Sequence, residues 1–169
     1  TINVNYLLYT PRFYQPKGEK KWPLILFLHG AGERGTNLAK VTIHGPPKLA
    51  KQGKDFPFII ASPQCPEGEA WSSEALTNLL DHLGAKYRVD TSRVYLTGLS
   101  MGGFATWALG IAHPERFAAI APICGGGEKI RILLASGKRQ AALQNLPVWA
   151  FHGAKDSTVL LEESERLIA

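Results

Sequence analysis

Cysteine and long apolar runs are scarce in this sequence of 169 residues. Its two cysteines, Cys65 and Cys124, form no CxxC pair, which excludes a zinc site built on paired cysteines. Two buried thiols or one disulfide bond remain open, and a disulfide would indicate an oxidising compartment. No apolar run approaches the ~18 residues that a membrane-spanning helix needs, so we expect no membrane partner.

A concentrated positive charge is also absent. The formal charge is +5, from 19 Lys and Arg against 14 Asp and Glu, but the basic residues are scattered along the chain. The densest basic cluster, Lys17–Trp22, is interrupted by Glu19 and has the composition of a solvated loop. We therefore expect no nucleic-acid partner.

A secretory signal is not visible either. The first twelve residues have neither the charged segment nor the long apolar segment of a signal peptide, so any such peptide is absent or already removed. The compartment and the oligomeric state stay open, and we prefer a mature secreted protein to a cytoplasmic one.

Short apolar runs alternate with longer amphipathic ones along the chain. We predict strands at Trp22–Gly30, Phe56–Pro63, Arg93–Gly98, Phe117–Gly125 and Pro147–Gly153, with an antiparallel edge strand at Asn3–Pro11. The first five are almost continuously apolar, which is typical of parallel strands buried on both faces. Helices are predicted from Ser72 or Ser73, over Met101–Ala112, and in two short pieces divided by Gly137. This alternation predicts one α/β domain over residues 1–169, with a mostly parallel sheet and helices on both faces.

A serine lies between two glycines where a predicted strand gives way to a predicted helix. The stretch Gly98-Leu99-Ser100-Met101-Gly102 matches G-x-S-x-G in the strand–turn–helix context of a nucleophilic serine. The alternative is a glycine-rich turn with an incidental serine. A nucleophilic Ser100 needs an oxyanion hole, and we expect its donors to be the backbone N–H groups of Met101 and Ala31. Ala31 follows another strand end, in "HGAGERG", where we expect His29 to shape the loop.

Five segments, quoted in chain order, carry a family resemblance: "LILFLHGAGERG", "SPQCP", "VYLTGLSMGGFATW", "APICGGG" and "PVWAFHGAKD". Together they resemble the α/β-hydrolase esterases often labelled predicted peptidases, which are related to phospholipase/carboxylesterases, feruloyl esterases and polyhydroxybutyrate depolymerases. The resemblance implies an α/β-hydrolase fold and places the acid of a catalytic triad at Asp156. The order of the residues agrees, because Asp156 follows a strand end downstream of the serine. A turn-forming aspartate is the alternative.

A histidine after Asp156 is missing. The five histidines are His29, His44, His82, His113 and His152, whereas the resemblance implies a triad histidine beyond Asp156. We expect that the chain is incomplete, that it lacks the C-terminal strand and helix of the fold, and that the base comes from residues beyond Ala169. His152 is the alternative base within the sequence.

The expected function is that of a serine carboxylesterase which hydrolyses short-chain or aromatic, feruloyl-type esters through an acyl-enzyme, without metal or cofactor. The expected partner is a small-molecule ester. Trp71, in the polar loop "PEGEAWSS", is either a lid packed on the core or a platform for substrate, and His44 is expected at the rim of the site. The alternatives are a serine peptidase of the same fold and a binding module that has lost catalysis.

Overall fold

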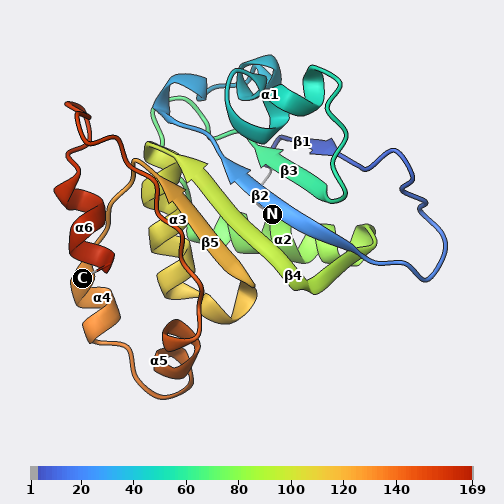
Figure 1. Ribbon diagram of the computed structural model, residues 1–169. Coiled ribbons are helices and arrows are strands. Elements are labelled where there is room, and N and C mark those ends of the chain that lie inside the picture. The colour runs from blue at the N-terminus through green and yellow to red at the C-terminus, as the bar shows by residue number, and fades with distance from the viewer. Residues whose placement is uncertain (1–3, 169) are drawn as a thin grey trace.

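The computed structural model describes residues 4–168, and Asn3, where we predicted the first strand to begin, lies outside them. Five strands form one sheet in the order β1-β3-β2-β4-β5, which crosses the centre of Figure 1. They are β1 (Tyr6–Tyr9), β2 (Trp22–Leu28), β3 (Ile59–Pro63), β4 (Val89–Leu99) and β5 (Ala119–Ile123). β1 pairs antiparallel with β3, and the remaining pairs are parallel. The predicted mostly parallel sheet with an antiparallel edge strand is confirmed.

Helices connect these strands within residues 4–168. They are α1 (Gly45–Lys51), α2 (Ser73–Lys86), α3 (Met101–Ala112), α4 (Lys129–Leu133), α5 (Gly137–Gln144) and α6 (Glu162–Ile168), with the 3-10 helices η1 (Ala31–Glu33), η2 (Leu38–Thr42) and η3 (Pro114–Arg116). Ser72 caps α2, because its Oγ accepts the backbone N–H of Ala75 at 3.2 Å. Gly137 begins α5 with a φ of 58°, so the predicted division there is confirmed. No helix in this range has the length and apolar character needed to cross a membrane.

The two faces of the sheet are covered by different helices. Leu24, Leu26 and Leu96 point to the face covered by α2 and α3, and each is at most 1% exposed. Successive residues of a strand point to opposite faces, so Phe27 lies on the other face. There α1 covers it so closely that a Cβ on Gly45 would lie 2.5 Å from the Phe27 ring. Helices therefore lie on both faces, as predicted.

The face that bears α1 is less completely buried than the other. Its β4 and β5 positions alternate with the buried ones and are partly exposed: Tyr95, Thr97, Leu99, Ala119, Ala121 and Ile123. Within residues 4–168, the deep core therefore lies between the sheet and the pair α2 and α3.

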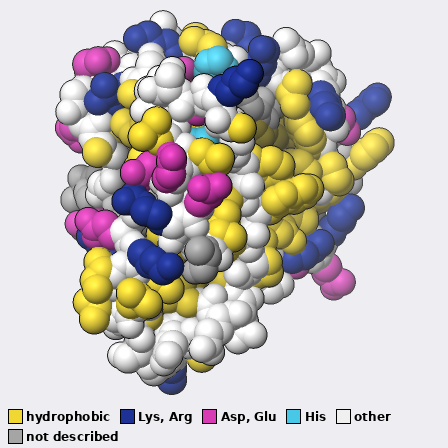
Figure 2. Space-filling model, turned by 60° about the vertical axis from the view of Figure 1, so that its left-hand side comes forward, with side chains coloured by type: hydrophobic (Ala, Val, Ile, Leu, Met, Phe, Trp, Pro, Cys, Tyr) yellow, Lys and Arg dark blue, Asp and Glu magenta, His cyan; other side chains and the backbone are white. Residues whose placement is uncertain are grey.

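The segment Pro147–Phe151 lies along the outer edge of β5. We predicted a strand at Pro147–Gly153, but the structure has only two isolated parallel bridges to β5, so a continuous strand is wrong. The Trp149 N–H donates to the Ile120 carbonyl at 3.0 Å, while the Trp149 side chain is 72% exposed. The segment therefore follows β5 as an irregular edge rather than as a regular strand, unlike β1 at the other edge, which pairs continuously with β3. Figure 2 turns the α6 side toward the viewer and shows hydrophobic side chains gathered in a broad band there.

Candidate active site

Ser100 lies in the turn between the end of β4 and the start of α3. Its backbone has a φ of 55° and a ψ of −115°, a conformation that a residue with a Cβ rarely adopts. Its N–H donates to the Ile123 carbonyl at 3.0 Å, and its own carbonyl accepts the Phe104 N–H at 2.9 Å. These bonds hold the strained residue from both sides, so the predicted strand–turn–helix context of Ser100 is present.

The glycines next to Ser100 have no Cβ, and this allows the backbones of neighbouring segments to pack in direct contact there. A Cβ on Gly102 would lie 2.0 Å from the Leu28 carbonyl oxygen, and one on Gly98 would lie 2.3 Å from the Gly102 carbonyl oxygen. A Cβ on Gly103 would lie 2.4 Å from the Ile123 carbonyl oxygen. Since real Cβ atoms do not approach oxygen this closely, the glycines are required for α3 to pack against β2 and β5.

Residues His29–Arg34, which we call the oxyanion loop, follow β2 and lie beside Ser100. A Cβ on Gly30 would stand 3.7 Å from the Ser100 Cβ and 3.5 Å from the Leu99 carbonyl oxygen. The loop continues into η1, which begins at Ala31, just as α3 begins at Met101. Backbone N–H groups at helix starts lack intrahelical acceptors, so both are suited to bind a negatively charged oxygen.

Three successive carbonyl groups of the oxyanion loop accept hydrogen bonds from side chains. The His29 carbonyl accepts from Trp71 Nε1 at 3.2 Å, the Gly30 carbonyl is 2.6 Å from His29 Nδ1, and the Ala31 carbonyl accepts from Arg34 Nε at 3.0 Å. These bonds fix the direction of the peptide units in the loop. They also show Trp71 as a partly buried side chain that supports the loop and packs against the core.

His29 is a buried, structural histidine. Its Nε2 accepts the Cys65 backbone N–H at 3.0 Å, so its Nδ1 carries the proton that is donated to the Gly30 carbonyl. Burial lowers the pKa of His29, which agrees with a neutral ring. Both ring nitrogens are therefore engaged, and His29 shapes the loop as predicted.

Glu33 is a buried carboxylate that the sequence analysis did not single out. Its side chain is 9% exposed, its Oε1 lies 3.6 Å from His44 Nε2, and its Oε2 lies 4.0 Å from His29 Nδ1. His44 is half exposed and directly precedes α1. The sequence signal was available, since Glu33 is the one acidic residue of "HGAGERG".

Asp156 lies in a turn beyond the edge segment. Its Oδ1 accepts the backbone N–H groups of Thr158 at 2.9 Å and Val159 at 3.0 Å. The N–H groups of Val159 and Thr158 hold the pKa of Asp156 below its ordinary value, so the carboxylate is ionised at neutral pH. Its Oδ2 lies 3.9 Å from His152 Nε2.

His152 forms its hydrogen bonds within this turn and with α6 rather than with Ser100. Its Nε2 donates to the Val159 carbonyl at 2.8 Å, its Nδ1 lies 2.7 Å from Ser164 Oγ, and its side chain is 3% exposed. Ser164 Oγ in turn donates to the Gly125 carbonyl at 2.9 Å. With both nitrogens engaged, His152 ties the turn to α6, which argues against the alternative that it is a free base.

Cys124 directly follows β5 and has both Ser100 and Asp156 as neighbours. Its φ is 40°, and its N–H donates to the Phe151 carbonyl at 2.8 Å. Burial raises the pKa of the Cys124 thiol, the nearby Asp156 carboxylate raises it further, and the Ser100 backbone N–H opposes both. The thiol is therefore protonated, and within the described residues it has no disulfide partner.

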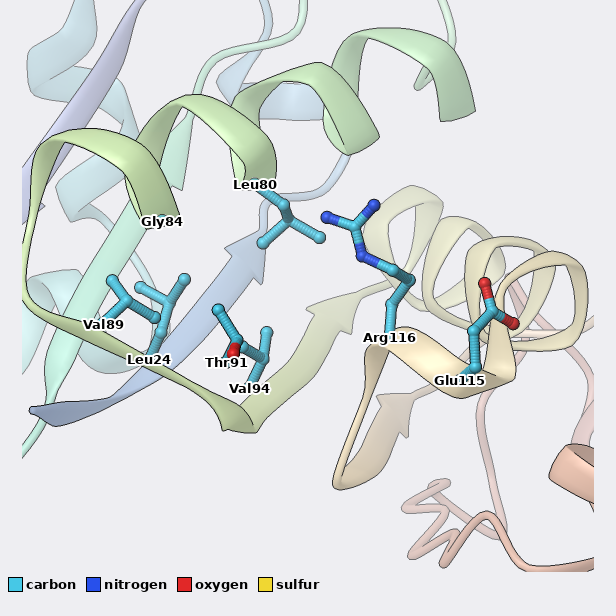
Figure 3. Close-up of a pocket in the computed structure, with 8 residues that line it drawn as sticks. All are labelled: Leu24, Leu80, Gly84, Val89, Thr91, Val94, Glu115 and Arg116. Atoms are coloured by element: carbon cyan, nitrogen blue, oxygen red, sulfur yellow. The ribbon is translucent and has the colours of Figure 1, made fainter.

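A separate cavity of about 220 Å³ lies at the opposite end of the strands. Figure 3 shows its apolar wall of Leu24, Leu80, Val89 and Val94, with Arg116 beside α2. Arg116 Nη2 donates to Asp81 Oδ1 at 2.6 Å. Ligands of open α/β sheets bind at the carboxyl ends of the strands, where the predicted site residues Ala31, Ser100 and Met101 follow β2 and β4.

Comparisons with known proteins identify the class. Over 99% of its length the chain matches the crystal structure of a thermostable esterase, with a TM-score of 0.78 and 32% identity, and it covers 47% of that chain. It also matches a ferulic acid esterase structure over 96% of its length, with a TM-score of 0.69 and 20% identity, covering 77% of that chain. The fold is that of the α/β hydrolases.

Residues 2–165 match the family model described as "Putative esterase", so the chain belongs to this esterase family. It is 40% identical over 70 residues to poly(3-hydroxyalkanoate) depolymerase C of Paucimonas lemoignei, which is 41% of this chain and 16% of that protein. It is 27% identical over 150 residues to the bifunctional acetylxylan esterase/xylanase XynS20E of Neocallimastix patriciarum, which is 85% of this chain and 20% of that protein. The chain thus spans a fifth or less of these two relatives.

Proposed function

We propose that this chain carries the nucleophile, the oxyanion hole and the acid of a serine carboxylesterase. The observation that carries the proposal is the strained Ser100, with a φ of 55° at the end of β4, beside a loop whose first three carbonyl groups accept hydrogen bonds from side chains. Membership of the esterase family supports it. The substrate is a small-molecule ester.

In the proposed reaction, Ser100 Oγ attacks the ester carbonyl carbon as its proton passes to a histidine base. The N–H groups of Ala31 and Met101 stabilise the oxyanion of the tetrahedral intermediate. The intermediate collapses to an acyl-enzyme as the alcohol leaves with the proton from the base, and water then releases the acid by the same steps in reverse order. Asp156, ionised and held by two backbone N–H groups, orients the base.

We assign the base to a histidine outside this sequence. His29 and His152 are buried with both ring nitrogens engaged. His82 lies within α2, and His113 ends α3, far along that helix from Ser100. His44, at the rim, is paired with Glu33.

Hydrolysis of p-nitrophenyl acetate by the 169-residue chain and by the longest native polypeptide that contains it tests this function. We expect Ser100-dependent turnover in the longer polypeptide and little in the chain alone. Turnover in neither would favour a binding module, for which the engagement of His29 and His152 is the supporting observation. Peptide hydrolysis faster than ester hydrolysis would favour the peptidase.

The proposed substrates are short-chain or aromatic esters. Among related sequences are proteins named acetylxylan esterase and feruloyl esterase B, which supports small acyl groups. We place Trp71 and His44 at the rim of the site, where the partly buried indole offers a surface for an aromatic acyl group. Comparison of acetyl, feruloyl and palmitoyl esters tests this choice, and faster hydrolysis of the palmitoyl ester would overturn it.

A further inference from the structure

Glu33 places a carboxylate close to the position where an esterase develops negative charge. Its Oε2 lies 3.3 Å from the point where a Cβ on Gly30 would stand, and the Ser100 Cβ lies 3.7 Å from the same point. An uncompensated carboxylate at such a distance would oppose the oxyanion and slow the reaction by about ten- to fiftyfold. A positively charged or hydrogen-bond-donating group beside Glu33 would reduce this opposition.

The surroundings of Glu33 leave one residue for this role among those that the structure describes. His29 lies 4.0 Å away but is held as the neutral tautomer by Cys65 and Gly30. Arg34, the next residue in the chain, keeps its positive charge but directs its guanidinium to the carbonyl groups of Ala31 and Glu69 rather than to the Glu33 carboxylate. His44 Nε2 faces Glu33 Oε1 at 3.6 Å, and its ring is half exposed.

We propose that His44 and Glu33 form a charge-compensating pair beneath the oxyanion loop, in which His44 keeps the Glu33 carboxylate from opposing the oxyanion. His44 acts through Glu33 and is therefore a positioning residue rather than a catalytic one. The inference rests on the proposed function, because it requires Ser100 as nucleophile and the oxyanion loop as donor. The proposal predicts that substitution of His44 lowers kcat for ester hydrolysis only when the Glu33 carboxylate is present.

A double-mutant cycle in the longest native polypeptide tests this dependence. His44→Gln should lower kcat for p-nitrophenyl acetate by about tenfold or more with KM changed less than about twofold, because the charge acts on the transition state. Glu33→Gln alone should stay within about threefold of wild type. The double variant should recover most of the lost kcat, since the opposing charge is gone.

A matched control is the exposed pair of His113 and Glu115, whose atoms are 3.9 Å apart. His113→Gln should leave kcat unchanged. A merely structural His44 would give a double variant at least as slow as His44→Gln, and that result would overturn the proposal. If Glu33→Gln does not fold, His44→Lys is measured in place of the double variant. Because lysine supplies a positive charge at position 44, kcat should stay within about threefold of wild type. A loss equal to that of His44→Gln would overturn the proposed pair.

Failure of the proposed function gives a different result. If Ser100→Ala leaves ester hydrolysis intact, Ser100 is not the nucleophile and the whole site is misassigned. If hydrolysis depends on Ser100 but the two glutamine substitutions lower kcat additively, only the charge-compensating pair is wrong.

Discussion

Ser100 and the oxyanion loop follow two central strands, β4 and β2, whereas Asp156 lies beyond the edge of the sheet in a turn after Pro147–Phe151. We call these the serine half and the aspartate half of the proposed site. In the serine half, backbone segments touch so closely that Gly98, Gly102 and Gly103 admit no Cβ. The aspartate half has no such contact at Gly153, where a Cβ would meet nothing nearer than 3.9 Å.

Side-chain hydrogen bonds hold the aspartate half instead. His152 joins the turn to Ser164 of α6, and Asp156 itself accepts two backbone N–H groups. Close backbone packing at a sheet centre fixes a position to a fraction of an ångström, while a turn at an edge depends on bonds that single substitutions remove. The serine half is thus the preformed part, and the two halves meet at Cys124.

Substitution of the nucleophile should give the largest effect. Ser100→Ala should lower kcat/KM for ester hydrolysis by about 10⁴-fold or more in the full-length protein, because the acyl-enzyme cannot form. The thermal transition should hardly move, and removal of the Ser100 hydroxyl from a strained turn does not disturb the glycine contacts. More than a few per cent of wild-type activity with an unchanged transition would exclude Ser100 as nucleophile.

The acid should matter less than the nucleophile. Asp156→Asn should lower kcat by about 10²-fold or more but by less than Ser100→Ala, because the residue orients the base instead of attacking. Asn keeps the acceptor oxygen for Thr158 and Val159, so the turn should persist. Wild-type kinetics for this variant would mean that another carboxylate serves as the acid.

A pair of alanine substitutions compares the packing of the two halves. Gly102→Ala should lower the free energy of unfolding by about 3 kcal/mol or more, because its Cβ would stand 2.0 Å from the Leu28 carbonyl oxygen. Gly153→Ala should change it by less than about 1 kcal/mol, since its Cβ would make only ordinary van der Waals contacts, the nearest at 3.9 Å from the Asp156 Cβ. Urea unfolding of both variants makes the measurement, and equal losses would contradict the difference between the halves.

Trp71 should have a smaller, substrate-dependent effect. Trp71→Ala should reduce kcat/KM for a feruloyl ester by about 0.5–1.5 kcal/mol more than for an acetyl ester, if the indole contacts an aromatic acyl group. Trp71→Phe serves as control, because it keeps the ring on His29 and removes only the donor to the His29 carbonyl. An equal loss on every ester, with a lower melting temperature, would confine Trp71 to supporting the loop.

The smallest expected effect is on the pH dependence of the free energy of unfolding, to which His29 and Asp156 contribute in different pH ranges. The pKa of His29 is lowered in the folded state, so the unfolded chain binds more protons, and stability should fall as the pH drops below about 6.5 toward the lowered pKa. The pKa of Asp156 is lowered as well, but its contribution is present above about 3.8 and disappears only below that pH. Urea titrations at pH 8, 6.5 and 5 should show a decline that His29→Gln reduces and Asp156→Asn does not.

Patterns of neighbouring residues in the sequence predicted most of the serine half. The apolar runs predicted β2 to β5, and the glycines around Ser100 predicted a strand–turn–helix, because both depend on residues adjacent in the chain. The edge segment Pro147–Phe151 was less predictable. Its residues are as apolar as those of the other strands, but a ladder needs neighbours that its own sequence cannot specify.

The sequence by itself determined the chain order of β2 to β5 with α2 and α3 between them, which serine stands in a strained turn, and which glycines surround it, although the ends of the strands shift by up to four residues. These features follow from steric limits on single residues and from the period of apolar side chains. Only the tertiary structure decided that Trp71 supports the His29 carbonyl, that Glu33 is buried against His44, and that His152 is tied to Ser164. Each of these contacts joins residues from separate segments of the chain, and their partners are determined by tertiary packing rather than by spacing along the chain.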